Sequence, residues 1–279
     1  MLLATCLALA SAVLHAGWNL AAKRAEGDRF VVLWAQFAVS GAIAAVLLAA
    51  HTVVVGMPAS GYGWGLISGL VHLPYLWLLG LAYTHGDFSV SYPIARGGGA
   101  ALAAVLGIAL LGDHLGTGEV LGIAIVVSGL CLLSSGATRG NVLIALAVAV
   151  TIGAYTTVDA HGARSSGSVA YVLATFAATG CTTSVFGVAT GRTAAFAAVL
   201  RRYWRRALVT GVAALVTYAM VLVAVRHAPV GYVAALRESS VVLGAFAGWR
   251  LLGEANHRRR ITAALVVCAG LVTLVVAGL

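Results

Sequence analysis

The chain divides into ten apolar segments of about 20 residues, which is the length of helix that crosses the hydrocarbon core of a membrane. Hydrophobic residues make up 61% of the 279 positions, and only 9% are charged. Only helices or closed barrels satisfy their backbone groups in lipid, and runs this long exclude strands. The sequence therefore predicts an all-α integral membrane protein with ten transmembrane helices. The expected spans are 2–22, 29–50, 62–83, 88–111, 117–135, 141–159, 168–190, 206–225, 230–252 and 260–278.

The net charge of +9 reflects basic residues in the short connectors between these segments. Thirteen of the seventeen lie in the odd-numbered connectors, whereas the even-numbered ones hold only Arg164 and Arg226. Connectors rich in Lys and Arg stay in the cytoplasm. We therefore expect a multi-pass protein of the cell inner (plasma) membrane with both termini on the non-cytoplasmic side. This arrangement does not favour nucleic-acid binding.

The two halves of the chain repeat one pattern at an offset of 141 positions. Arg96 precedes an apolar stretch that ends in Leu-Leu-Gly-Asp113, and Arg237 precedes one that ends in Leu-Leu-Gly-Glu254. The expected repeats are 1–138 and 139–279, each with five helices. Because five is odd, the second repeat enters the membrane inverted, as in transporters with a binding site at the midplane.

Arg96 and Arg237 fall near the membrane centre, roughly 10–12 Å from the start of their helices at 1.5 Å per residue. A charge at this depth is costly and needs compensation. The neighbouring carboxylate, Glu238, neutralises one arginine at most. The candidate partners of the other arginine are an anionic group on the substrate, Asp159, or a water-filled cavity lined by tyrosines. Since Glu238 is adjacent to Arg237, whereas Arg96 precedes three glycines, we expect Arg96 to contact the substrate. Guanidinium groups bind carboxylates and phosphates through two bonds, which favours an anionic or zwitterionic ligand.

Polar stripes on several apolar helices predict a shared cavity. His15 and Asn19 are four residues apart, and so are Tyr155 and Asp159. Hydrogen bonding between helices is the alternative for such residues. Asp159 lies near the end of its predicted helix, where exposure to solvent is the alternative. If transport is coupled to protons, the candidate carriers are Glu238, His15 and Asp159.

Other chemistry finds little support in the sequence. The four cysteines are isolated in apolar runs, without CxxC spacing, so we expect small buried residues rather than disulfides or metal ligands. HExxH, GxSxG and the phosphate-binding GxxxxGK[ST] do not occur. We therefore expect no metal, no cofactor and no enzymatic activity. The glycines 97–99 after Arg96 are either packing residues or a hinge.

The chain resembles the drug/metabolite transporter (DMT) superfamily, in particular its EamA-type members with ten helices. The resemblance rests on the two half-repeat endings and on His15-Ala-Gly-Trp18-Asn19, Tyr92-Pro-Ile-Ala-Arg96-Gly97 and Leu236-Arg237-Glu238-Ser239-Ser240. It implies a secondary active carrier, commonly an exporter or exchanger of metabolites, with a central cavity. Many relatives have a proline just beyond the Arg96 position, which this chain lacks. Many relatives also keep both termini in the cytoplasm, whereas the count of basic residues in the connectors of this chain places them on the other side.

The expected function is secondary active transport of a small anionic or zwitterionic metabolite by alternating access. The alternatives are a flippase for a lipid-linked substrate and an exporter of organic cations. The expected partners are the substrate, the lipid bilayer and a coupling proton, in a monomer or homodimer. The candidate substrate-binding residues are Arg96, Arg237, Glu238, Tyr92, His15, Trp18, Asn19, His72, Tyr75, Tyr155 and Asp159.

Overall fold

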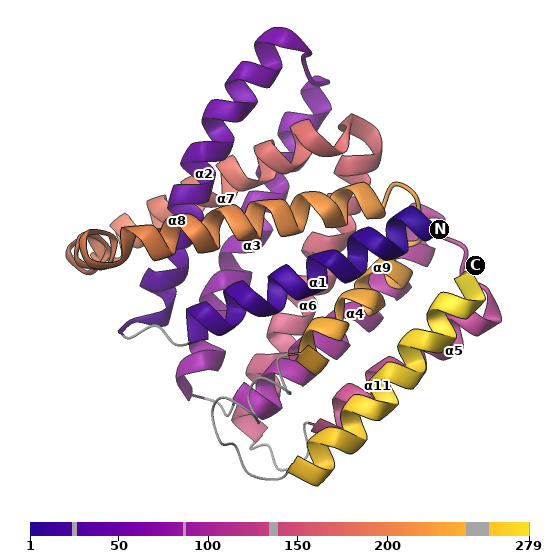
Figure 1. Cartoon of the computed structure of the whole chain (residues 1–279). Helices are drawn as coiled ribbons and strands as arrows, with labels where there is room; N and C mark the ends of the chain where they lie inside the picture. The colour runs from indigo at the N-terminus through magenta and orange to yellow at the C-terminus, as the bar shows by residue number, and fades with distance from the viewer. Residues whose placement is uncertain (24–26, 86–87, 134–138, 244–256, 279) are drawn as a thin grey trace.

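The computed structural model describes residues 1–23, 27–85, 88–133, 139–243 and 257–278. These residues form helices joined by short connectors, with no strand among them (Figure 1). The helices are α1 (Leu2–Lys23), α2 (Arg29–Val54), α3 (Ala59–His85), α4 (Phe88–Leu111), α5 (Thr117–Leu133), α6 (Arg139–Ser166), α7 (Ser168–Ala189), α8 (Thr193–Ala224), α9 (Val230–Arg237) and α11 (His257–Gly278).

Six of the described helices are long and apolar enough to cross a membrane. They comprise α2, α7, α8 and most of α3, α4 and α6. Shorter apolar helices occur at Leu2–Trp18, Thr117–Leu132 and Thr262–Ala277. The expected all-helical class and the membrane character are thereby confirmed.

The two ends of the chain lie close together at one end of the bundle, which we call the terminal end (Figure 1). Helix α1 packs against α8, α4 against α6, and α2 against α7 and α8. Helix α3 lies between α6 and α7, while α5 and α11 form a pair at one edge. Helices α1, α3, α6, α8 and α9 therefore converge on the middle of the bundle.

Small residues permit this close packing. A Cβ atom on Gly41 of α2 would lie 2.8 Å from the Cα atom of Gly180 on α7, so these backbones are in direct contact. Helix α4 is continuous through Gly97–Gly99. There Gly97 faces Leu130 of α5, and Gly99 faces Ile152 of α6. These glycines are packing residues in this conformation.

Helices α6 and α8 differ from their predicted bounds. Helix α6 continues to Ser166, so Asp159 is not at a helix end. Helix α8 begins at Thr193 rather than 206 and has 32 residues, about 48 Å of helix, which exceeds the membrane core. A non-helical residue, Tyr203, divides it, and the part after Tyr203 has the length of one span.

The predicted helix over 230–252 is also interrupted. Helix α9 ends at Arg237, and Glu238 forms a turn before residues 239–243 become helical again. Residues 244–252 lie outside the described part of the chain.

The cysteines are a further correction. Cys6, Cys131, Cys181 and Cys268 are free and exposed on the surface of the bundle. Their apolar neighbours reflect contact with lipid rather than with a protein core, which hydropathy alone does not distinguish.

Candidate functional site

Arg96 and Glu238 form a buried ion pair between α4 and the turn after α9. Arg96 Nη2 lies 2.7 Å from Glu238 Oε1, and Nε donates to Oε2 over 3.2 Å. The side chains are 4% and 2% exposed. A charged group that is buried away from water needs a partner of opposite charge, and here each of the two side chains is the partner of the other.

The pairing reverses the expectation that Arg96 is the uncompensated cation. Adjacent residues on a helical turn point in different directions, so Glu238 faces α4 while Arg237 points elsewhere. Arg237 is 5% exposed and lines a cavity, and its Cζ atom lies 5.9 Å from the centre of the Tyr218 ring. Arg237 therefore lines this cavity, whereas Arg96 does not.

The cavity lies in the middle of the bundle and has a volume of about 40 Å³. This space holds roughly three water molecules, so a metabolite enters only if helices move apart. Side chains from seven helices, α1, α2, α3, α6, α7, α8 and α9, line it. They are His15, Trp18, Phe37, His72, Tyr75, Tyr155, Thr175, Phe176, Thr179, Ala214, Thr217, Tyr218 and Arg237.

Four buried polar atoms of this lining have no hydrogen-bond partner in the described chain: Trp18 Nε1, Thr175 Oγ1, Thr217 Oγ1 and Arg237 Nε. Eight side-chain atoms in the described protein share this property, so half of them meet in one cavity. Buried polar groups are rarely left unpaired without a reason. The indole and guanidinium nitrogens only donate, so together they suit an acceptor-rich, anionic group.

Aromatic side chains form the rest of the lining. The His72 ring stacks on Tyr155 with centroids 4.2 Å apart, and Tyr75 meets Tyr155 edge-on at 5.1 Å. His15 packs edge-on against Trp18. The cavity thus combines one cation with apolar ring faces, which fits a ligand that carries an anionic group on an apolar body.

Asp159 lies behind this lining and is completely buried. Tyr171 of α7 donates to Oδ1 over 2.9 Å, and Tyr218 of α8 donates to Oδ2. The alternative of a solvent-exposed Asp159 is therefore wrong, because α6 extends beyond it and two neighbouring helices cover it.

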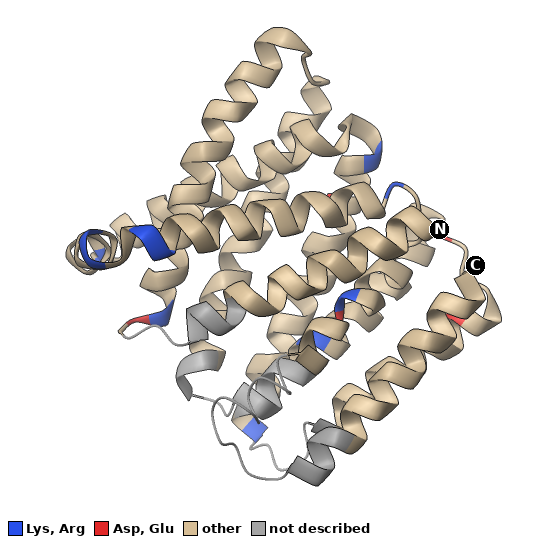
Figure 2. Cartoon of the chain, viewed as in Figure 1, with Lys and Arg blue, Asp and Glu red and all other residues tan. Residues whose placement is uncertain are grey.

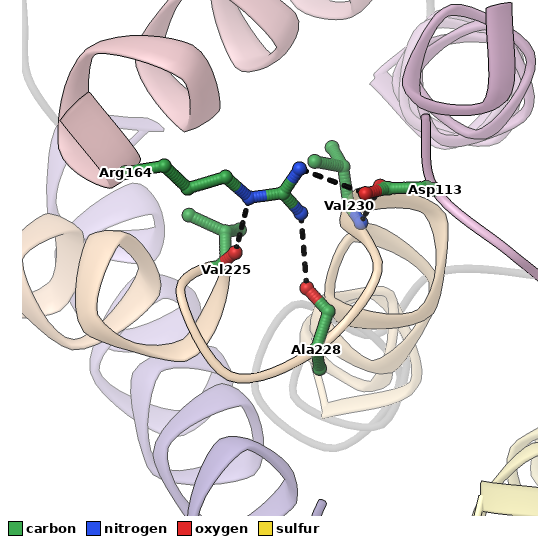
Figure 3. Close-up of polar contacts among 5 residues, drawn as sticks. All are labelled: Asp113, Arg164, Val225, Ala228 and Val230. Atoms are coloured by element: carbon green, nitrogen blue, oxygen red, sulfur yellow. Dashed lines mark hydrogen bonds and ion pairs between the residues drawn. The ribbon is translucent and has the colours of Figure 1, made fainter. Parts of the chain in front are cut away.

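A second ion pair ties three segments together, the end of α4, α6 and the α8–α9 connector (Figure 3). The α8–α9 connector lies at the terminal end (Figure 1). Arg164 Nη1 lies 2.7 Å from Asp113 Oδ1, and Arg164 also donates to the carbonyl oxygens of Val225 and Ala228. The second carboxylate oxygen of Asp113 accepts from Val230 N over 2.6 Å. We call Asp113 and Arg164 the terminal clamp, since they join α4, α6 and the α8–α9 connector.

The structure brings seven of the predicted residues together around this cavity: Arg237, His15, Trp18, His72, Tyr75, Tyr155 and, one layer behind, Asp159. Arg96 and Glu238 bind each other. The side chains of Asn19 and Tyr92 lie outside the described residues.

The candidate residues from the sequence included none on α2, α7 or α8, where Thr175, Thr217 and Tyr218 line the cavity. The four-residue spacing of Thr175, Thr179 and Thr183 was a usable signal for α7. Tyr218 follows Thr217 in an apolar run, which is the same kind of signal that marks the cavity residues of the other helices.

Among the described residues, no group of three or more His, Cys, Asp or Glu side chains could hold a metal ion.

Comparison with known proteins shows the fold alone. No protein-family model and no curated protein matches the sequence. Solved structures do match, 28 chains in all. One crystal structure superposes with a TM-score of 0.74 at 16% identity, covering 98% of this chain and 97% of that one. The architecture therefore occurs in other proteins over its full length.

Proposed function

We propose that this protein is a secondary active transporter of the drug/metabolite type, which carries small organic anions by alternating access. The supporting observation is the group of unpartnered polar atoms around Arg237 in a cavity otherwise walled by aromatic rings. A permanent charge inside the membrane is costly and marks a pathway in membrane proteins. A carboxylate, phosphonate or phosphate group would satisfy it.

The Arg96–Glu238 pair supplies the framework of this site. It fixes the turn after α9 against α4 and so holds the end of α9, where Arg237 projects into the cavity. Discontinuous helices that present a binding group at mid-membrane are common in transporters with inverted repeats. The interruption at Glu238 and the 141-residue offset both support such a repeat here.

Alternating access gives the terminal clamp a role. Asp113 and Arg164 hold α4, α6 and the α8–α9 connector together, so the cavity opens toward that end only if their contacts break. With the orientation that the basic connectors predict, this end faces the non-cytoplasmic side.

A ligand screen tests the proposal. Purified protein is heated with benzoate, phenylphosphonate, benzamide and benzyltrimethylammonium, and the melting temperature is recorded for each. We expect the two anions to raise it and the neutral amide to have little effect. The matched variants are Arg237→Gln, which removes the charge, and Thr217→Val, which removes one hydroxyl at constant volume.

The aromatic lining favours one competitor, an organic cation held by ring faces. Stabilisation by benzyltrimethylammonium but not by benzoate would overturn the anion proposal and favour this reading. The charge of Arg237 inside the same cavity opposes it.

A further inference from the structure

Asp159 is a carboxyl group that the proposed anion site does not use. It is wholly buried in α6 and is held by the hydroxyl groups of Tyr171 and Tyr218. An ionised carboxylate in an apolar interior is expensive unless it is paired. An ionised Asp159 behind the cavity therefore needs nearby groups that compensate its negative charge.

Tyr218 connects Asp159 to Arg237. Its hydroxyl group donates to the carboxylate, while the guanidinium lies 5.9 Å from the centre of its ring. One side chain thus contacts the acidic group and the ligand-binding cation at once.

Other groups also face Asp159, among them the hydroxyl group of Ser68 on α3. His72 of α3 interacts with Asp159 electrostatically, and Tyr155 lies on the same helix. Arg96 of α4 and Glu238 after α9 compensate each other. Tyr171 of α7 and Tyr218 of α8 supply hydroxyl groups only. Arg96 and Arg237 carry two positive charges in this interior, and Glu238 and ionised Asp159 carry two negative ones, so the four buried groups sum to zero.

Tyr171 makes two protonation states possible at Asp159. Its hydroxyl oxygen lies 2.9 Å from Asp159 Oδ1 and 3.3 Å from the carbonyl oxygen of Trp64. A tyrosine donates one hydrogen bond and accepts others. Beside an ionised Asp159, Tyr171 donates to the carboxylate. If Asp159 gains a proton, the carboxyl group donates to Tyr171, which turns its own hydrogen to Trp64.

We propose that Asp159 binds one proton when a monovalent anion occupies Arg237, so that proton and anion cross the membrane together. The inference rests on the proposed anion site. Arg237 and ionised Asp159 sum to zero charge, the anion adds one negative charge, and the proton restores neutrality. A zwitterion brings its own positive charge and takes up no proton.

This coupling predicts a direction. Because proton and anion move the same way, an inward proton gradient drives uptake of the anion. Export, which the family resemblance implies, would require an outward gradient or exchange for a second anion.

The first test needs no ligand, because Arg237→Gln removes the charge that an anion would neutralise. Infrared spectroscopy measures the carboxylic-acid band of protonated Asp159 as the pH is varied. The band is assigned to Asp159 by its absence in Asp159→Asn. We expect Asp159 to become protonated about one pH unit or more higher in Arg237→Gln than in wild type. Arg237→Lys, which keeps the charge, should titrate like wild type. Equal titration of all three proteins would overturn the coupling.

The second test counts protons during binding. Calorimetry of benzoate and of 4-(aminomethyl)benzoate, in buffers of different ionisation enthalpy, gives the protons taken up per ligand. At a pH where Asp159 is ionised, we expect close to one proton with benzoate and none with the zwitterion. Asp159→Asn should bind benzoate without proton uptake.

The outcomes separate the two proposals. Benzoate binding at Arg237 with no proton uptake in wild type would overturn the coupling and leave the anion site intact. The expected infrared shift in Arg237→Gln, with no benzoate binding to wild type, would overturn the anion site and the coupling with it, and would leave only an electrostatic link between Arg237 and Asp159. If Arg237→Gln does not fold, the calorimetric result alone decides.

Discussion

Arg96 and Glu238, which are 142 positions apart in the sequence, bind each other through two contacts in the interior of the bundle. Arg96, which was expected from the sequence to contact the substrate, is thus bound to Glu238. Arg237 faces the cavity. The ion pair joins α4 to the turn that follows α9, where Glu238 lies.

Removal of one member of this pair should destabilise the protein. Arg96→Gln removes the ion-pair partner of the buried Glu238 carboxylate, at a cost of roughly 3–5 kcal/mol. The free energy of unfolding in detergent, measured by denaturant titration, checks this value. The double variant Arg96→Gln/Glu238→Gln should recover most of the loss. A single variant as stable as wild type would show that the pair does not compensate the charges.

The terminal clamp should control access to the cavity from the terminal end. We expect Asp113→Asn, which removes the charge that Arg164 contacts, to speed up labelling of a cysteine at position 217 by a membrane-impermeant thiol reagent. All proteins in this measurement carry replacements of the four native cysteines, Cys6, Cys131, Cys181 and Cys268, so that position 217 holds the only thiol that reacts. Arg164→Lys keeps the charge and should increase the rate less. Identical rates in clamp variants and wild type would argue against a closing role.

Close packing of α2 on α7 should make Gly41 intolerant of substitution. Gly41→Val places side-chain atoms against the backbone of Gly180 and should cost about 1–3 kcal/mol or more. The matched control is Gly63→Ala, because a Cβ atom at Gly63 meets nothing within 4 Å. Thermal unfolding of both variants measures the difference. Equal stability would mean that the two helices are further apart than described.

The excess of basic residues in the odd-numbered connectors predicts that both termini face away from the cytoplasm. Fusion of alkaline phosphatase to the C-terminus should therefore give an active enzyme, and a green fluorescent protein fusion should be dark. The opposite pattern would invert the topology and place the terminal clamp on the cytoplasmic side.

The sequence predicted the helical class and most helix positions because membrane spans are defined by hydropathy and length alone. It also predicted most of the cavity, since His15, His72, Tyr75, Tyr155 and Arg237 stand out as polar or aromatic residues in apolar runs. Which charge binds which was not predictable from sequence. Glu238 is next to Arg237 in the chain, but the turn at the end of α9 directs it to Arg96.

Interactions between segments that are distant in the chain could not be predicted from the sequence either. The contact of Tyr218 with Asp159 joins two helices 59 positions apart, and Arg164 reaches Asp113 across 51. Arg164 appeared as an ordinary connector residue in the charge count. Only the packing of α6 against the α8–α9 connector shows that it binds three partners.

The affinity of purified protein for benzoate and for benzamide, in wild type and Arg237→Gln, tests the central claim most directly. A charge-assisted hydrogen bond contributes about 1.5–3 kcal/mol, which corresponds to roughly a 10- to 100-fold preference for the anion. We predict this preference in wild type and in Arg237→Lys, and its loss in Arg237→Gln. An undiminished preference for benzoate in Arg237→Gln would contradict an anion site at Arg237.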